Sequence, residues 1–162
     1  MPLENDEDEV EESCSEIIHG LWVGSEGSAS SKQFFEKEEI KACLNCTPTI
    51  QNNFSFSGIE YLRLPLNDSP EKEDITLMRE LLPLGVEWLR VHHQVLGLNV
   101  LVHCHMGIAR SASIVCAYLM KHWGMTFKDA ADFMILRRQA VFYNGDYGTF
   151  KTVLQEWETL CK

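Results

Sequence analysis

A cysteine, a glycine and an arginine stand close together between two apolar segments of the 162-residue chain. In "LVHCHMGIARSASIV" (101–115), Cys104 ends a strand-like run and Arg110 follows six residues later. A turn that carries Gly107 and small residues before a helix leaves unpaired N–H groups that bind an anion such as phosphate. The Arg110 guanidinium adds a planar pair of donors suited to a phosphoryl group. Because such surroundings favour a thiolate, Cys104 is predicted to be a nucleophile that attacks phosphorus.

The apolar pattern around this turn predicts the elements that position it. The run "NVLVHC" (99–104) is apolar and β-branched, which is typical of a central strand buried on both faces. The run "SASIVCAYLMKHW" (111–123) is apolar on nearly every side and predicts a buried helix that ends at Gly124. Ligands of parallel sheets bind beyond the carboxyl ends of the strands, which is where Cys104 falls.

The rest of the chain alternates strand-like and helix-like segments. Further strands are predicted at 20–24, 40–47 and 59–66, and further helices at 32–39, 69–95, 127–138 and 146–160. In the long segment, Asp74 is the expected helix cap before Ile75, and Pro83 is expected to kink or interrupt the helix. Thr126 with Asp129 predicts a capping box for the next helix. This order implies a single α/β domain with a mostly parallel central sheet of about four or five strands flanked by helices.

Charge and composition narrow the classes of partner. The formal net charge is −10, but seven acidic residues and no basic ones lie within residues 4–12, so about −3 remains for the rest. We therefore expect an acidic disordered leader over residues 1–14, a folded domain over residues 15–162, and no nucleic-acid partner, which would need a clustered basic face. No apolar stretch has transmembrane length and no signal peptide is visible, so we expect no stable membrane insertion and a location in the cytoplasm, the nucleus or both.

The six cysteines lack the paired spacing of a disulfide framework, and free thiols are expected. Cys43 and Cys46 would point to opposite faces of their strand, so no zinc site is expected there.

The sequence His103-Cys104-x5-Arg110-Ser111 matches the HCx5R(S/T) signature, and the chain resembles the cysteine-dependent protein tyrosine phosphatases. Over about residues 16–160 it is similar to their small, stand-alone (atypical) dual-specificity members. The segments that carry this similarity are "LWVGS", "LNCT", "LPLND" and "YNGDYGTF". The resemblance implies the phosphatase fold over residues 15–162, hydrolysis of phosphotyrosine and phosphoserine/threonine in proteins through a phosphocysteine, and no metal or cofactor.

The resemblance also implies a role for each motif residue. Cys104 attacks phosphorus, Arg110 binds the equatorial oxygens, and Ser111 hydrogen-bonds the sulfur and helps it leave. His103 supports the loop from outside the pocket, with a simple packing role as the alternative. Asn144, in the segment before the final helix, braces the catalytic loop. The residues whose amides bind the phosphoryl oxygens are His105, Met106, Gly107, Ile108, Ala109 and Arg110.

The family takes the leaving-group proton from an Asp on the loop before the long helix, and Asp68 in "LPLNDSPEKED" lies at the matching place. Asp68 is predicted to act first as general acid and then as base for the hydrolytic water. Glu71, Glu73 and Asp74 compete for that role, and Asp68 could instead only form the turn ahead of Ser69.

The chain departs from the family pattern at three places. Tyr143 stands before Asn144 where Pro is common, and Met106 and Ala109 stand where relatives often carry Ala and Ser. Met106 could narrow the pocket or contact an aromatic leaving group.

Two other functions stay open. One is a catalytically weak phosphoprotein-binding module, although Cys104, Arg110 and Ser111 are all present. The other is a phosphatase for a non-protein phosphate, a phosphoinositide or an RNA 5′-phosphate, which the apolar Ile108 and Ala109 disfavour. The physiological substrate, the preference between phosphotyrosine and phosphoserine/threonine, and the oligomeric state do not follow from the sequence.

Two regulatory readings are also predicted. Cys46 is a candidate to trap an oxidised Cys104 as a disulfide, whereas Cys116 belongs to the core. The acidic leader could also visit the Arg110 pocket as a mimic of an acidic substrate.

Overall fold

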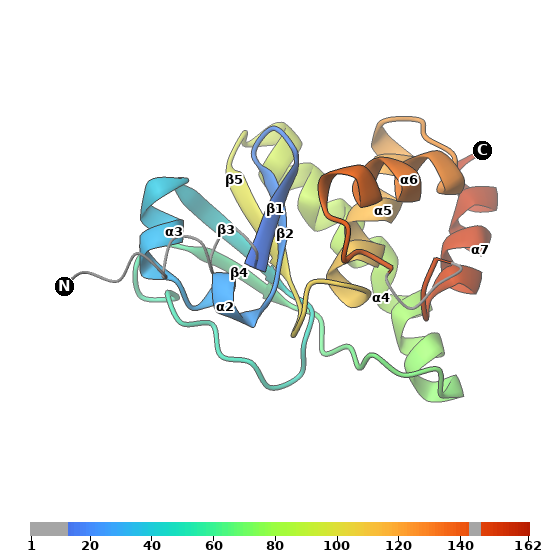
Figure 1. Ribbon diagram of the computed structural model, residues 1–162, viewed down its shortest axis with the longest axis horizontal. Coiled ribbons are helices and arrows are strands. Elements are labelled where there is room, and N and C mark those ends of the chain that lie inside the picture. Colours follow the sequence, from blue (N-terminus) through green and yellow to red (C-terminus); the bar gives the residue numbers. More distant parts are fainter. Residues whose placement is uncertain (1–12, 143–146) are drawn as a thin grey trace.

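A mixed five-stranded sheet organises the chain in the computed structural model, which describes residues 13–142 and 147–162 (Figure 1). The strands are β1 (Cys14–Ile18), β2 (Leu21–Gly24), β3 (Ile40–Asn45), β4 (Glu60–Arg63) and β5 (Asn99–His103). Their order in the sheet is β1-β2-β5-β3-β4, and β1 pairs with β2 antiparallel while all other pairs are parallel. The predicted single α/β domain with a mostly parallel sheet is therefore confirmed.

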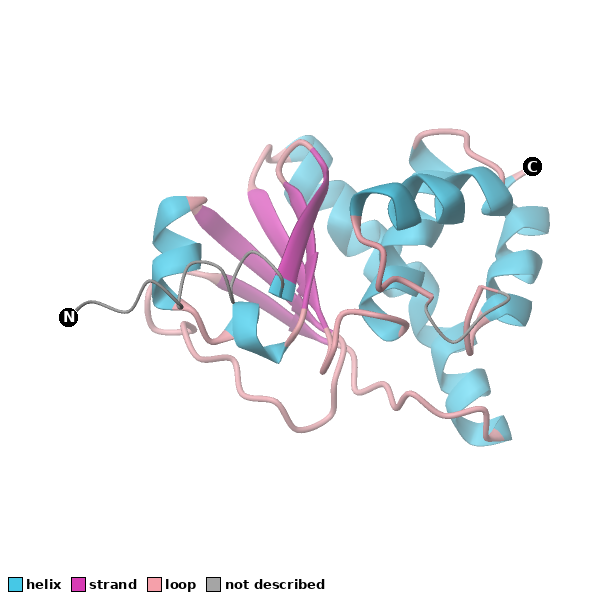
Figure 2. Ribbon diagram, viewed as in Figure 1, coloured by secondary structure: helices cyan, strands magenta, loops and turns pink. Residues whose placement is uncertain are grey.

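Helices cover both faces of the sheet (Figure 2). They are α2 (Glu26–Ala29), α3 (Lys32–Lys37), α4 (Lys72–Leu89), the π-helix η1 (Arg90–Val95), α5 (Arg110–His122), α6 (Phe127–Arg137) and α7 (Lys151–Cys161). The short α2 and α3 lie on one side of the sheet, and α4 to α7 form a larger layer on the other. None of the helices within residues 13–142 and 147–162 is both long and apolar enough to cross a bilayer.

The central strand β5 is buried on both faces, as predicted. Val100 and Val102 belong to the main core with α5, and Leu101 packs on the opposite face with Phe34 and Phe35. Helix α5 is buried at every position from Ser111 to Met120.

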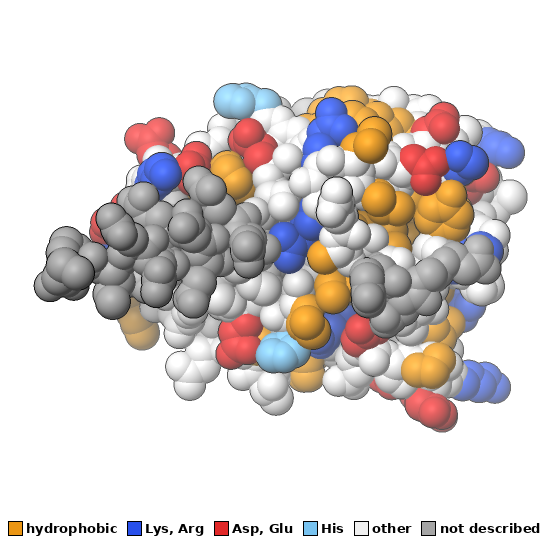
Figure 3. Space-filling view, in the orientation of Figure 1, with side chains coloured by type: hydrophobic (Ala, Val, Ile, Leu, Met, Phe, Trp, Pro, Cys, Tyr) orange, Lys and Arg blue, Asp and Glu red, His pale blue; other side chains and the backbone are white. Residues whose placement is uncertain are grey.

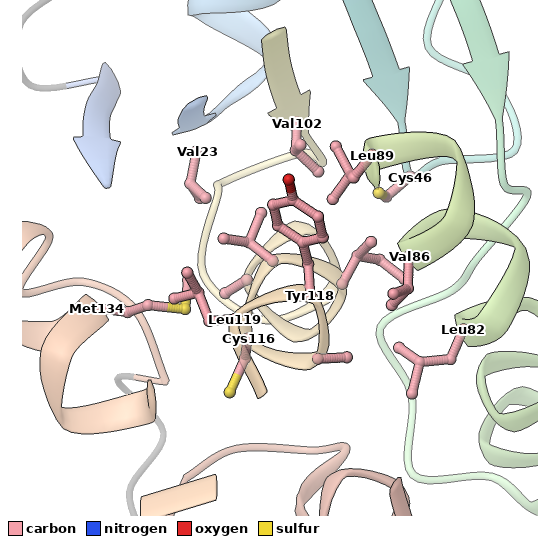
Figure 4. Packing of buried hydrophobic residues seen from close by; sticks show 14 of the residues in the cluster. Val23, Cys46, Leu82, Val86, Leu89, Val102, Cys116, Tyr118, Leu119 and Met134 are labelled. Carbon is pink, nitrogen blue, oxygen red and sulfur yellow. The ribbon is translucent and has the colours of Figure 1, made fainter. Parts of the chain in front are cut away.

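Figure 4 shows why α5 tolerates so few polar side chains. Tyr118 points toward the sheet, and Val86 and Leu82 of α4 and Met134 of α6 surround the helix. The helix that carries Arg110 at its start is thus fixed by packing on several sides.

Several element boundaries differ from the predictions. Helix α4 begins at Lys72 after Glu71, so the prediction of Asp74 as its cap is wrong. Asp74 instead lies in the first turn, where a carboxylate favours the helix dipole, and it accepts a hydrogen bond from Asn67 Nδ2 at 3.1 Å. Pro83 lies inside α4 without interrupting it, since the buried Leu82 and Val86 hold the helix on both sides of it.

The two later helices test the capping predictions. Thr126 Oγ1 accepts a hydrogen bond from the Asp129 amide at 3.1 Å, which confirms Thr126 as the cap of α6. Helix α7 begins only at Lys151, later than predicted, because Tyr147 and Gly148 adopt left-handed φ angles of 68° and 85°.

No strand is predicted for residues 14–18, yet β1 forms there and extends the sheet by one antiparallel neighbour. It starts at Cys14, which the predicted leader (1–14) includes. Residues 1–12 of that leader lie outside the described residues, as does Asn144.

Candidate active site

The loop between β5 and α5 contains the predicted nucleophile and depends on one glycine. Gly107 has a φ of +67°, a left-handed value that side chains other than glycine rarely adopt. A Cβ at this position would lie 2.7 Å from the carbonyl carbon and oxygen of Gly24 at the end of β2. The loop therefore packs directly on the backbone of a neighbouring strand, and only glycine allows this approach.

Cys104 is buried, and donors converge on its sulfur. Its Sγ lies 3.2 Å from Ser111 Oγ and accepts a hydrogen bond from the Gly107 amide at 3.2 Å. Burial alone raises the pKa of Cys104, but hydrogen bonds from the hydroxyl and amide of Ser111 lower it. The positive charge of Arg110 and the Ile108 amide lower it further, so the net pKa falls below the usual value of a thiol. The site therefore favours the thiolate, the form that attacks phosphorus.

The Arg110 side chain connects the loop to the segment that precedes α4. Its Nη1 donates a hydrogen bond to the carbonyl oxygen of Leu66 at 2.9 Å. Its Nε is buried and has no hydrogen-bond partner in the described part of the chain. An unpaired buried donor is unfavourable, so a bound phosphoryl oxygen would supply the acceptor that this nitrogen lacks.

A second arginine, absent from the predicted site, holds the loop in place. Arg138, at the end of α6, is only 7% exposed. Its Nε donates to the carbonyl oxygen of Gly107 at 2.9 Å and its Nη2 to that of Met106 at 3.1 Å. Its Nη1 reaches Ser15 Oγ in β1 at 3.4 Å. These bonds hold two loop carbonyls toward Arg138 and away from Cys104, whose sulfur instead accepts the Gly107 amide.

His103 is buried on β5 and contacts the loop from the strand. Its Nδ1 donates to the carbonyl oxygen of Cys104 at 3.2 Å. Burial lowers the pKa of His103 to about 4, so the imidazole is neutral at pH 7. This contact is what a supporting residue would make, and the role itself stays a prediction.

The predicted acid, Asp68, lies in an exposed segment next to the site. Its Oδ1 accepts a hydrogen bond from Thr149 Oγ1 at 3.0 Å. The Arg110–Leu66 hydrogen bond brings the chain two residues before Asp68 to the catalytic loop. Of the competing carboxylates, Glu71 precedes α4, and Glu73 and Asp74 lie in its first turn. The structure thus brings the Asp68 segment to Arg110, while the role of Asp68 stays a prediction.

The remaining loop residues divide between the core and the surface. Ala109 is buried, and the Ile108 carbonyl oxygen accepts a hydrogen bond from the Phe142 amide at 3.0 Å. His105 and Met106 are exposed at the rim, and Met106 has 59% of its surface accessible. Met106 therefore lies where it can contact a substrate rather than fill the core.

The two cysteines of the CxxC segment pack into different cores. Cys43 belongs to the cluster with Phe34 and Phe35, and Cys46 to the main cluster that also contains Cys104. Both are free thiols whose burial raises their pKa. The disulfide between Cys46 and Cys104 stays a prediction, and a peptide map after mild peroxide treatment tests it. Absence of a peptide that links these two cysteines would contradict it.

Comparison with known proteins places the chain in a family. Residues 21–159 match the family described as dual specificity phosphatase, catalytic domain. The chain is 32% identical over 148 residues to dual specificity protein phosphatase 1B of Arabidopsis thaliana, with 89% of this chain and 81% of that protein covered. It is 35% identical over 133 residues to the protein phosphatase Slingshot homolog of Xenopus laevis, with 82% of this chain covered, but it spans only 18% of that longer protein.

A solved structure agrees with these relatives. The human tyrosine phosphatase-like serine/threonine/tyrosine-interacting protein superposes with a TM-score of 0.77 and 30% identity, covering 91% of this chain and 96% of that one. Together with the loop that joins Cys104 to Arg110, these matches show that the chain belongs to the dual specificity phosphatase family.

Proposed function

We propose that this protein hydrolyses phosphotyrosine and phosphoserine/threonine in proteins through a phosphocysteine intermediate. The observation that carries the proposal is the sulfur of Cys104, which accepts the Gly107 amide and lies 3.2 Å from the Ser111 hydroxyl. Its lowered pKa favours the thiolate in the same loop that presents Arg110. A thiolate beneath a preorganised set of donors is the chemistry of attack on a phosphoryl group.

In the first step, the Cys104 thiolate forms a bond to phosphorus while the phosphorus–oxygen bond of the ester breaks. The amides of residues 105–110 and the Arg110 guanidinium bind the three equatorial oxygens, where the negative charge is spread. The leaving oxygen takes a proton from Asp68. The products are the dephosphorylated alcohol or phenol and a phosphocysteine.

In the second step, water attacks the phosphocysteine. Asp68, now a carboxylate, accepts the proton of the water, and the sulfur–phosphorus bond breaks. The Ser111 hydroxyl, 3.2 Å from Sγ, stabilises the thiolate as it leaves. Inorganic phosphate is released and the enzyme returns to its first state.

The enzyme is tested first with an aryl phosphate in the presence of a metal chelator. We expect hydrolysis by the wild type and at least about a 10³-fold loss in Cys104→Ser, since a serine hydroxyl is a far weaker nucleophile at this position. Cys104→Ser should still bind a phosphopeptide because its loop amides remain. The matched control is Cys161→Ser, at the end of α7, which should keep full activity.

Turnover by Cys104→Ser equal to that of the wild type would contradict the mechanism. Phosphopeptide binding by the wild type without any hydrolysis would favour the binding-module alternative instead. The wild type should also dephosphorylate peptides with phosphotyrosine and with phosphoserine or phosphothreonine. Activity confined to a phosphoinositide or to an RNA 5′-phosphate would contradict the protein substrate.

A further inference from the structure

A pair of side chains at the rim of the catalytic loop has no role in the mechanism. His105 Nδ1 lies 3.1 Å from Glu26 Oε2, and the Glu26 amide donates to the His105 carbonyl oxygen at 2.9 Å. These two contacts join Glu26, in α2, to His105, the residue directly after Cys104. The second carboxylate oxygen, Glu26 Oε1, accepts no hydrogen bond from the described part of the chain, so it is open to another donor.

This pair forms one wall of an open hollow of about 440 Å³ beside the catalytic loop. The opposite wall is the segment that joins β3 to β4. The residues that line the hollow are Glu26, Ser30, Thr49, Ile50, Gln51, Asn53 and His105. In the view of Figure 3, acidic, histidine and apolar side chains lie side by side on the surface near α2 and the catalytic loop.

The wall formed by residues 46–53 is held rigidly by buried polar groups. Asn45 Nδ2 donates to the Ile50 carbonyl oxygen at 2.7 Å, and Asn45 Oδ1 accepts the Thr47 hydroxyl at 2.7 Å. Arg63 donates to the carbonyl oxygens of Thr47 at 2.9 Å and Ile50 at 2.7 Å. The hollow is therefore formed before substrate binds, which lowers the entropy lost on binding.

The charged and polar groups around the hollow determine which kind of side chain could bind in it. Its lining contains the Glu26 carboxylate and no Lys or Arg, together with the His105 ring, hydroxyl groups and the amide side chains of Gln51 and Asn53. The guanidinium of Arg63 is used in bonds to the loop backbone, and Arg63 does not line the hollow. Oxygen acceptors around a carboxylate suit a side chain that is cationic and a donor, and they disfavour a second carboxylate.

We propose that this hollow is a substrate subsite, in which Glu26 selects phosphoproteins with a Lys or Arg side chain next to the phosphorylated residue. The inference rests on the proposed phosphatase function, because only a phosphoryl group bound by the catalytic loop brings the neighbouring residues of the substrate to the hollow. His105 connects the two sites, since its amide is a predicted phosphate ligand and its ring lines the hollow. His105 also holds the Glu26 carboxylate at the rim.

The subsite is tested with phosphotyrosine peptides of one length in which a single position, from two residues before to two residues after the phosphotyrosine, is Arg, Gln or Glu. The measured quantity is kcat/KM for the Arg peptide divided by kcat/KM for the Glu peptide, taken within each enzyme variant. Changes in chemistry common to both peptides cancel in this ratio. At one scanned position or more, the wild type should prefer Arg by about threefold to tenfold, the range of a partly exposed ion pair.

Glu26→Gln should lower that ratio toward one, and Glu26→Lys should reverse it. The matched control is Glu36→Gln, which removes an exposed carboxylate on α3 that pairs with Lys32 at 3.7 Å and should leave the ratio unchanged. Increasing the salt concentration should reduce the wild-type ratio more than that of Glu26→Gln.

Equal kcat/KM values for Arg and Glu peptides at every position, or a preference that persists in Glu26→Gln, would overturn the subsite and leave the phosphatase function intact. An equal loss of preference in Glu36→Gln would also overturn it, because the effect would then come from net charge alone. No hydrolysis of any phosphopeptide or aryl phosphate by the wild type would overturn the proposed function together with the subsite.

Discussion

The catalytic loop (103–111) and the segment that carries the predicted acid (65–71) meet at Arg110, yet they are held in different ways. The loop lies against Gly24 at Gly107, and Arg138 binds two of its carbonyl oxygens from a buried position. The Phe142 amide binds a third carbonyl, that of Ile108, at 3.0 Å. The loop geometry is thus determined by several independent contacts.

Most of the acid segment is exposed, although Leu66 is buried, and three hydrogen bonds hold it. Asp68 accepts a hydrogen bond from Thr149, Asn67 donates to Asp74, and the Leu66 carbonyl accepts Arg110 Nη1. Only the last of these bonds is to the loop. The predicted nucleophile and phosphate-binding groups are thus held by buried contacts, whereas the predicted acid is held by exposed ones. If the proposed roles hold, substitutions in the loop should therefore affect every substrate, and substitutions around Asp68 only those that need an acid.

The largest effect is expected from Gly107→Ala, which disrupts the packing of the catalytic loop. The new Cβ would lie 2.7 Å from Gly24, so the loop must shift and its donors lose their alignment. We expect kcat/KM to fall by about 10³-fold on every phosphate ester, because misplaced reacting groups and donors have effects of this size. Steady-state kinetics with an aryl and an alkyl phosphate measure it.

Gly97→Ala is the matched control for this change. Gly97 also has a left-handed φ of +66°, but no heavy atom lies within 4 Å of the position its Cβ would occupy. The two variants therefore share the backbone strain, about 1 kcal/mol of stability, and differ only in the contact. If both lost activity equally, the close approach to Gly24 would not matter to the site.

Asp68→Ala is expected to have the next largest effect, restricted to substrates that need an acid. An alkyl phosphate such as phosphoserine has a poor leaving group, so kcat should fall by about 100-fold. An aryl phosphate with an acidic phenol should lose only a few-fold. A plot of rate against leaving-group pKa for the wild type and the variant measures the difference.

Asp74→Ala is the control, since Asp74 lies in the first turn of α4 and is bonded to Asn67. Should Asp74→Ala show the leaving-group dependence while Asp68→Ala does not, the acid is assigned to the wrong residue. An Asp68→Ala variant that retains substrate also suits a pull-down that identifies the phosphoproteins it binds.

Arg138→Met should lower kcat by about tenfold, because the carbonyl oxygens of Met106 and Gly107 lose the donors that orient them. Arg137→Met is the control, since Arg137 is exposed and lies over the Phe133 ring at 3.4 Å. Kinetics are compared well below the melting temperature of each variant, so that a loss of fold is not read as a loss of rate. Unchanged kcat in folded Arg138→Met would show that the loop holds its shape without this brace.

The residues of the catalytic loop could be predicted from the sequence, whereas the distant residue that holds the loop could not. Cys104, Gly107 and Arg110 lie within seven consecutive positions, so the local turn chemistry could be read directly, and the buried β5 and α5 followed from their apolar runs. Arg138 is 31 residues from the carbonyl it binds, and an arginine at the end of an amphipathic helix gives no signal of burial.

Other features also depend on tertiary contacts. Strand β1 is short and its burial pattern alternates only in part. Its extended conformation therefore depends on pairing with β2 more than on its own sequence. Glu26 lies far from Cys104 in the sequence, and only the fold shows that its carboxylate reaches His105. The beginning of α4 at Lys72 reflects the geometry after Pro70 rather than a side-chain cap, since Glu71 makes none.

Ser111→Ala probes the thiolate through the pH dependence of kcat/KM on an aryl phosphate. The Ser111 hydroxyl is the strongest of the groups that lower the pKa of Cys104, so its removal raises that pKa. Because the thiolate exists only above this pKa, the acidic limb of the profile should move to higher pH, and activity should be lost first at low pH. Ser113→Ala, which removes a hydroxyl bonded to the Ala109 carbonyl oxygen rather than to sulfur, should leave the limb in place. An identical limb in Ser111→Ala and the wild type would contradict this role.

The smallest effect is expected from Thr149→Val, which removes one contact of the exposed acid segment and leaves the contacts of the catalytic loop unchanged. The substitution removes the hydroxyl that donates to Asp68 at 3.0 Å and keeps the shape of the side chain. Because this bond is exposed, we expect kcat on an alkyl phosphate to fall only about twofold to threefold, with the aryl phosphate unaffected. The control is Thr159→Val. Thr159 lies in α7, the helix that follows Thr149, and its hydroxyl donates to the Glu156 carbonyl oxygen at 2.6 Å. A faster alkyl reaction in Thr149→Val would show instead that this bond holds the acid away from its working position, and the contrast between the two segments would then include a restraint that substrate must break.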